Sequence, residues 1–138
     1  MPIVVDASIA VKWFILEVHS EDAARLLRSK QDFLAPDLIW AEVGNVLWKK
    51  VLRKEISFEQ ARGILKDFLR FPVQTFGSHA LLDAAWGLAA QYGITVYDSL
   101  YLAVAISQNC SAVTADRKFY GSLHTKPVGQ KFLWVEDI

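Results

Sequence analysis

Residues 3–14 read IVVDASIAVKWF, and this stretch decides the fold class. Residues 3–5 form a short apolar run of β-branched side chains, which predicts a fully buried strand. Residues 7–16 predict a helix immediately after it, and Asp6 stands at the junction. A buried strand followed at once by a helix is typical of α/β proteins.

The same alternation continues along the chain. Further strands are predicted at residues 33–35, 73–76, 94–96, 112–115 and 132–135. Helices are predicted at residues 20–30, 38–54, 57–70, 79–92 and 98–108, with a short one after Asp116. Three of these helices have an expected N-cap residue: Ser20, Asp37 and Ser57. Strands that alternate with helices imply a mainly parallel central sheet, so we expect a three-layer α/β/α fold in a single domain over residues 1–138.

The composition excludes several classes of protein. The chain has 15 basic and 15 acidic side chains and therefore no overall cationic field, so a nucleic-acid site must be a local patch. The single cysteine, Cys110, excludes an internal disulfide, and the three histidines lack metal-ligand spacing, which argues against zinc. No leader precedes the first strand and no apolar run is long enough to cross a bilayer. We therefore expect a cytoplasmic protein without a membrane partner.

Four carboxylates are expected to gather at one edge of the sheet. Asp6, Asp98 and Asp116 each follow a predicted strand, and the carboxyl ends of parallel strands share an edge. Glu42 lies in the first turns of the helix after the second strand, which starts at the same edge, and Asn45 continues its face.

Taken singly, each carboxylate has a structural explanation. Asp98 and Asp116 could cap the helices that they begin. Asp6 could form a turn after its strand, and Glu42 could be an ordinary surface residue of its helix. None of these explanations predicts a common edge, so the combination favours a functional site.

Several carboxylates in one crevice need a counter-charge if they are to stay ionised. Oxygen ligands without histidine or thiolate select a hard cation, Mg²⁺ or Mn²⁺. Such ions, singly or as a pair, activate water for the cleavage of phosphodiester bonds. The pattern therefore predicts metal-dependent hydrolysis by a metal-activated water.

Four segments, in this order, resemble the PIN domain, and particularly the VapC-type toxins of bacterial and archaeal toxin–antitoxin pairs: IVVDASIAVKWF, DLIWAEVGNVLWK, VYDSLYLAVA and AVTADRKFY. The resemblance covers nearly the whole chain. It implies a PIN-like fold and a Mg²⁺- or Mn²⁺-dependent endoribonuclease whose catalytic and metal-binding residues correspond to Asp6, Glu42, Asp98 and Asp116.

The resemblance also implies supporting residues and partners. Ser8 and Thr114 match hydroxyl positions of the family, and Asn45 matches a polar position three residues after the Glu. A VapC-type toxin is expected to form a homodimer and to bind a cognate antitoxin that covers the active site.

Basic residues near the predicted site are candidates for contacts with the RNA substrate. Lys12, Arg117 and Lys118 lie nearest to it in the sequence. A second basic group ends the helix that carries Glu42: Lys49, Lys50, Arg53 and Lys54. That group could be a track for RNA phosphates or a solvated helix end favoured by the helix dipole, and the second interpretation is preferred.

Other functions remain open at this point. A PIN-fold RNA-processing nuclease without a toxin role would share the chemistry, and a non-catalytic RNA-binding protein would share only the fold. Asp6 at the end of a first strand also matches the nucleophile of a phosphotransferase. A haloacid-dehalogenase-like enzyme of that class would have a second Asp at position 8, where this chain has Ser8.

Overall fold

The computed structural model describes all 138 residues and contains one five-stranded sheet. The strands are β1 (Pro2–Val5), β2 (Asp32–Pro36), β3 (Gln74–Phe76), β4 (Ser111–Thr114) and β5 (Phe132–Trp134). They lie in the order β3-β2-β1-β4-β5, and every neighbouring pair is parallel. The predicted α/β fold with a parallel central sheet is confirmed.

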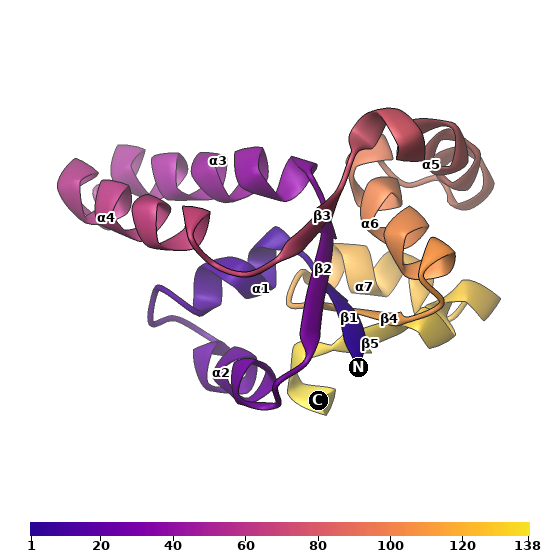
Figure 1. Cartoon of the computed structure of the whole chain (residues 1–138), viewed down its shortest axis with the longest axis horizontal. Helices are drawn as coiled ribbons and strands as arrows, with labels where there is room; N and C mark the ends of the chain where they lie inside the picture. The colour runs from indigo at the N-terminus through magenta and orange to yellow at the C-terminus, as the bar shows by residue number, and fades with distance from the viewer.

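Seven α-helices connect and flank the strands (Figure 1). They are α1 (Ala7–Lys12), α2 (Ser20–Arg28), α3 (Leu38–Leu52), α4 (Phe58–Leu69), α5 (Ser78–Tyr92), α6 (Val96–Ser107) and α7 (Arg117–Leu123). Short 3-10 helices follow at Pro127–Lys131 and Val135–Asp137. No helix combines the length and the apolar character that crossing a membrane requires.

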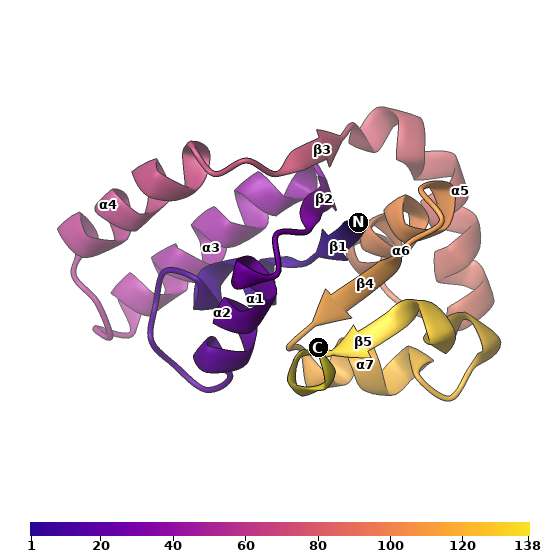
Figure 2. The same ribbon diagram turned by 60° about the horizontal axis from the view of Figure 1, so that its bottom comes forward.

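The helices form layers around the sheet. Helices α1 to α4 lie on one side of it and α5 and α6 on the other, while α3 and α4 form a hairpin that extends beyond the sheet (Figure 2). Helix α6 packs against β1, β2 and β4, and α5 covers its outer side. Every side chain from Ser99 to Ala105 is consequently buried, which explains why this helix is apolar all round.

The predicted strand at residues 94–96 is wrong. Gly93 ends α5 in a left-handed conformation with φ +66°, and α6 begins at Val96. The hydroxyl of Thr95 caps α6 by accepting a hydrogen bond of 3.0 Å from the backbone N–H of Asp98. Ile94 and Thr95 therefore form a tight link between two helices, because helix capping outweighs the strand preference of this β-branched run.

Of the three predicted N-caps, Ser20 is wrong, Asp37 is correct in position only, and Ser57 is confirmed. Ser20 lies inside α2, where its hydroxyl donates to the carbonyl of Ile15 at 2.8 Å. Asp37 occupies the N-cap position of α3, but its side chain forms no capping hydrogen bond there; the carboxylate instead accepts from the backbone N–H of Ser78 at 3.1 Å, at the start of α5. Ser57 caps α4 as predicted.

Candidate functional site

The four predicted carboxylates lie on four different elements. Asp6 joins β1 to α1, Glu42 lies in the second turn of α3, Asp98 in the first turn of α6, and Asp116 directly after β4. Despite this separation they interact electrostatically. Burial is the main cause of the raised pKa of Asp6, Glu42 and Asp98, and the negative charge of Asp116 adds to the increase in each.

Asp6 is the most constrained of the four. Its side chain is only 7% exposed, and burial raises its pKa to about 6. Ser8 donates its hydroxyl to Oδ1 at 2.5 Å, and the backbone N–H of Ile9 donates to the same oxygen at 3.1 Å. The hydroxyl of Thr114, from β4, donates to Oδ2. Asp6 therefore caps α1 and is held from both sides by the two predicted supporting hydroxyls.

Glu42 is held by a residue that the sequence did not reveal. Tyr101, on α6, donates its hydroxyl to Oε1 of Glu42 at 2.5 Å and is itself only 2% exposed. Burial raises the pKa of Glu42, and this hydrogen bond opposes the increase. Burial also raises the pKa of Tyr101, with the charge of Glu42 adding to the effect, so the phenol remains a neutral donor. The sequence signal that could have indicated Tyr101 is its position three residues after Asp98, on the same face of α6.

Asp98 and Asp116 differ in their surroundings. Asp98 is half-buried, and its pKa rises to about 6 because of burial first and the charges of Asp116 and Glu42 second. Asp116 is exposed and caps α7 by accepting hydrogen bonds from the N–H groups of Lys118 and Phe119, at 3.0 and 3.2 Å. The capping explanation is thus correct for Asp116, whereas Asp98 lies within the first turn of a helix that Thr95 caps.

None of the four carboxylates forms a salt bridge. The structure also has no group of three or more His, Cys, Asp or Glu side chains arranged to hold a metal ion directly. The donor set is nevertheless chemically suited to Mg²⁺, which prefers oxygen ligands, keeps several of its waters and needs only one or two carboxylates. Residues of this type therefore fit a hydrated hard cation better than a fully protein-enclosed one.

The other predicted site residues differ in their exposure and in their contacts. Asn45 is exposed on α3. Lys118 is exposed on α7, and its positive charge opposes part of the rise in the pKa of Asp98. Lys12 instead pairs with Glu17, with 3.0 Å between Nζ and Oε1. The guanidinium of Arg117 lies 4.7 Å from the centre of the Trp134 ring.

Comparison with known proteins shows to which family the chain belongs. The family model of the PIN domain matches residues 3–121. Ribonuclease VapC3 of Pyrobaculum aerophilum is 32% identical over 120 residues, which cover 86% of this chain and 92% of that protein.

Two solved structures share the fold. A crystal structure of a Pyrobaculum aerophilum protein superposes with a TM-score of 0.73 at 25% identity, covering 99% of this chain and 90% of the other. A toxin–antitoxin complex from Klebsiella pneumoniae contains a chain with a TM-score of 0.68 at 15% identity, covering 98% of both chains. The chain therefore belongs to the PIN domain family, and it resembles a named VapC ribonuclease over most of its length.

Proposed function

We propose that this protein is a metal-dependent endoribonuclease, the toxin of a VapBC-type toxin–antitoxin pair. The observation that carries the proposal is that the four carboxylates, from four different elements, lie near enough to affect one another while none has a salt-bridge partner. Such a set of carboxylates is unfavourable unless a cation compensates its charge. The similarity to a named ribonuclease supports RNA as the substrate.

The residues of the chain have distinct roles in this proposal. A bound Mg²⁺ or Mn²⁺ ion would supply an activated water and would stabilise negative charge on the phosphate. Asp6 and Asp98 would hold the ion, and Asp116 would assist them. Ser8 and Thr114 keep Asp6 oriented, because both hydroxyls donate to its carboxylate.

Glu42 would serve either as a ligand of the ion or as a group that positions the water the ion activates. Tyr101 fixes the direction of its carboxylate by donating to Oε1. The remaining oxygen, Oε2, is free to face the ion or the water, since no hydrogen bond within the protein occupies it.

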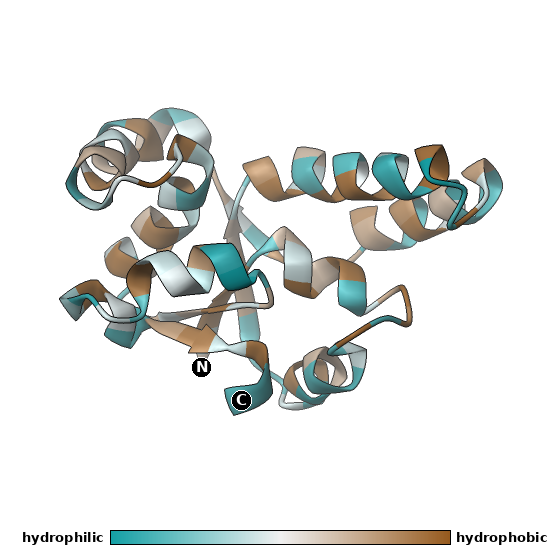
Figure 3. Cartoon of the chain, turned by 180° about the vertical axis from the view of Figure 1, so that it is seen from behind, coloured by the Kyte–Doolittle hydropathy of each residue, from teal (hydrophilic) through white to brown (hydrophobic).

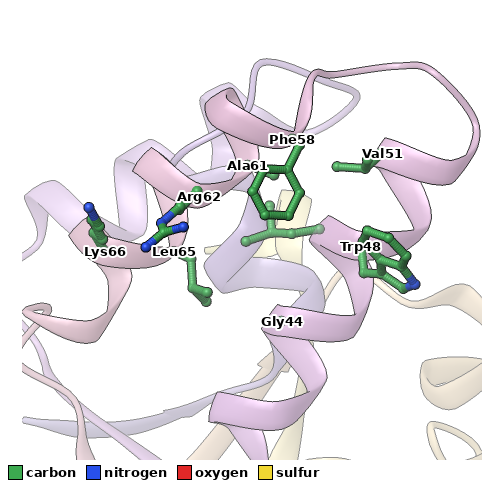
Figure 4. Close-up of a pocket in the computed structure, with 9 residues that line it drawn as sticks. Gly44, Trp48, Val51, Phe58, Ala61, Arg62, Leu65 and Lys66 are labelled. Carbon is green, nitrogen blue, oxygen red and sulfur yellow. The ribbon is translucent and has the colours of Figure 1, made fainter.

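An apolar hollow between α3 and α4 supports an antitoxin partner. It has a volume of about 420 Å³ and is lined by Gly44, Leu47, Trp48, Val51, Phe58, Ala61, Arg62, Leu65 and Lys66. Figure 4 shows the Phe58 ring between the two helices, with Arg62 and Lys66 along α4. The helices also carry alternating hydrophobic and hydrophilic bands (Figure 3). An amphipathic antitoxin segment with acidic residues at its edge would complement this surface.

A homodimer is proposed through another surface. Leu82 and Trp86 lie one turn apart on α5, and Trp86 is 68% exposed. A large aromatic side chain left this exposed is typical of protein interfaces. A second copy of the chain would cover it.

A cleavage assay tests the proposed activity. The purified protein is incubated with structured RNAs in Mg²⁺, in Mn²⁺ or in EDTA. We expect defined cleavage products with either ion and none in EDTA. Equal cleavage in EDTA and in Mg²⁺ would contradict metal dependence, and intact RNA under all three conditions would favour a non-catalytic RNA-binding protein.

A further inference from the structure

A second hollow, between α1 and α3, lies next to the carboxylate site. Its volume is about 310 Å³, and it is lined by Ser8, Val11, Lys12, Glu17, Val46, Lys49, Lys50 and Arg53. We call it the α1–α3 hollow. It starts at Ser8, the residue whose hydroxyl donates to Oδ1 of Asp6 at 2.5 Å. The hollow therefore borders a residue that holds one of the proposed catalytic carboxylates.

The lining of the α1–α3 hollow is strongly cationic. Four of its side chains are basic and one, Glu17, is acidic. Glu17 pairs with Lys12 at 3.0 Å and with Lys50 at 2.9 Å. Burial opposes its ionisation, but hydrogen bonds from the two lysines outweigh burial and lower the pKa of Glu17. The carboxylate is therefore charged at neutral pH, and it neutralises only part of the positive charge.

Lys49 and Arg53 keep their charges available. Lys49 has no salt-bridge partner, and Arg53 has only Glu55, with 3.8 Å between Nη1 and Oε2. Both side chains are exposed. At about 1.5 Å per helical residue, Lys49 and Arg53 lie about 10 Å and about 16 Å from Glu42 along α3. The two cations therefore form a line that leads away from the carboxylates.

The helix-dipole explanation does not account for all of these residues. It explains cations at the end of α3, where the last carbonyls carry partial negative charge. It does not explain why Lys12, from α1, lines the same hollow, or why that hollow begins at Ser8. The α3–α4 hollow lies on a different face of α3. Its lining residue Trp48 is two positions before Lys50, and Val51 is two positions before Arg53, and residues two apart on a helix do not share a face.

We propose that the α1–α3 hollow binds backbone phosphates of the RNA on one side of the scissile bond. The inference rests on the proposed ribonuclease function and adds the path of the substrate. Lys49 and Arg53 contact phosphates directly. Glu17 limits the affinity, because it occupies Lys12 and Lys50, which would otherwise attract the same phosphates.

RNA binding measured by fluorescence anisotropy in EDTA tests this path without cleavage. The double variant Lys49→Gln/Arg53→Gln is compared with Arg28→Gln/Lys30→Gln, which removes the same charge at the end of α2, outside both hollows. Each phosphate contact to a single strand contributes about 0.7 to the salt slope, so we expect the slope to fall by about 1.4 and the affinity by roughly tenfold in the first variant only. Equal slopes and affinities in the two double variants would overturn the proposal.

Glu17→Gln supplies a test in the opposite direction. It removes the negative charge from the hollow, and we expect RNA to bind several-fold more tightly with a steeper salt dependence. Circular dichroism establishes that each variant is folded. Unchanged or weaker RNA binding by folded Glu17→Gln would contradict the proposal.

These results separate the RNA path from the proposed activity. If wild type fails to cleave RNA in Mg²⁺, the ribonuclease function fails whatever the slopes are. If wild type cleaves but Lys49→Gln/Arg53→Gln matches the control variant, only the path fails. If Lys49→Gln/Arg53→Gln weakens the binding of a polyglutamate peptide more than that of RNA of equal charge, while the control variant does not, the hollow is a site for an acidic protein segment and the RNA assignment is overturned.

Discussion

The hydroxyl of Tyr101 on α6 donates a hydrogen bond of 2.5 Å to Oε1 of Glu42 on α3, across 59 positions of sequence. The bond connects the helix that carries Asp98 to the helix that carries Glu42. Two of the four carboxylates are therefore positioned relative to each other by a buried neutral donor.

Tyr101→Phe removes that donor while it keeps the aromatic ring in place. We expect metal-dependent cleavage to fall by about tenfold with little change in KM, because Glu42 loses its fixed direction. The free energy of unfolding should fall by about 1 kcal/mol, since the half-buried carboxylate of Glu42 loses a hydrogen bond. Cleavage kinetics and thermal unfolding measure the two effects.

Tyr97→Phe is the matched control for this variant. Tyr97 lies on the same helix but is 62% exposed, and its hydroxyl forms no hydrogen bond within the protein. We expect wild-type kinetics from it. Equal activity of Tyr101→Phe and Tyr97→Phe would show that the Tyr101–Glu42 bond has no role in positioning.

Thr114→Val tests how Asp6 is kept ionised. Burial raises the pKa of Asp6 to about 6, and the Thr114 hydroxyl is one of the groups that oppose the increase. Valine has nearly the same shape but no hydroxyl, so the pKa of Asp6 should rise further. Because the ionised form binds the cation, activity is lost as pH falls through this pKa, and the acid limb of the pH–rate profile should move to higher pH.

Thr75→Val provides the comparison for Thr114→Val, since Thr75 lies on β3 and forms no side-chain contact with the four carboxylates. The acid limb of the pH–rate profile of Thr75→Val should coincide with that of wild type. An acid limb that stays at the wild-type pH in Thr114→Val would remove Thr114 from the proposed support of Asp6.

Trp86→Glu tests the proposed dimer surface on α5. A buried, unpaired carboxylate at an interface is strongly unfavourable, so the variant should sediment as a monomer while wild type sediments as a dimer. Trp48→Glu is the control, because Trp48 lines the α3–α4 hollow instead. Monomeric wild type, or a dimer that survives Trp86→Glu, contradicts the assignment of this surface.

The sequence was sufficient for the fold class, but not for the contacts that hold the predicted carboxylates in place. Residues 3–5 and 112–114 form buried β-branched strands, and such runs predict parallel strands directly. The run at residues 94–96 has the same composition, yet the αL conformation of Gly93 and the Thr95 cap place it at a helix start. Local composition does not distinguish these two outcomes in so short a run.

Tyr101 illustrates the second limit. In the sequence Tyr101 is one of many hydrophobic residues in this helix, and its hydrophobic character does not set it apart from the others. Its contact with Glu42 depends on how α3 and α6 are placed against the sheet, which the sequence pattern does not specify. The pairing of Lys12 with Glu17 was missed for the same reason, because the segment after α1 turns back toward the helix.

Mn²⁺ binding measured by electron paramagnetic resonance tests the central claim most directly, since it reports the ion without requiring an RNA substrate. Wild type is compared with Asp98→Asn, which keeps the size of the side chain but removes a charge from the carboxylate group. We predict that wild type binds Mn²⁺ and that Asp98→Asn binds it at least about tenfold more weakly, because even residues outside the direct ligand shell contribute about 10–100-fold to metal affinity. Equal Mn²⁺ affinity in the two proteins would contradict a metal site formed by these carboxylates.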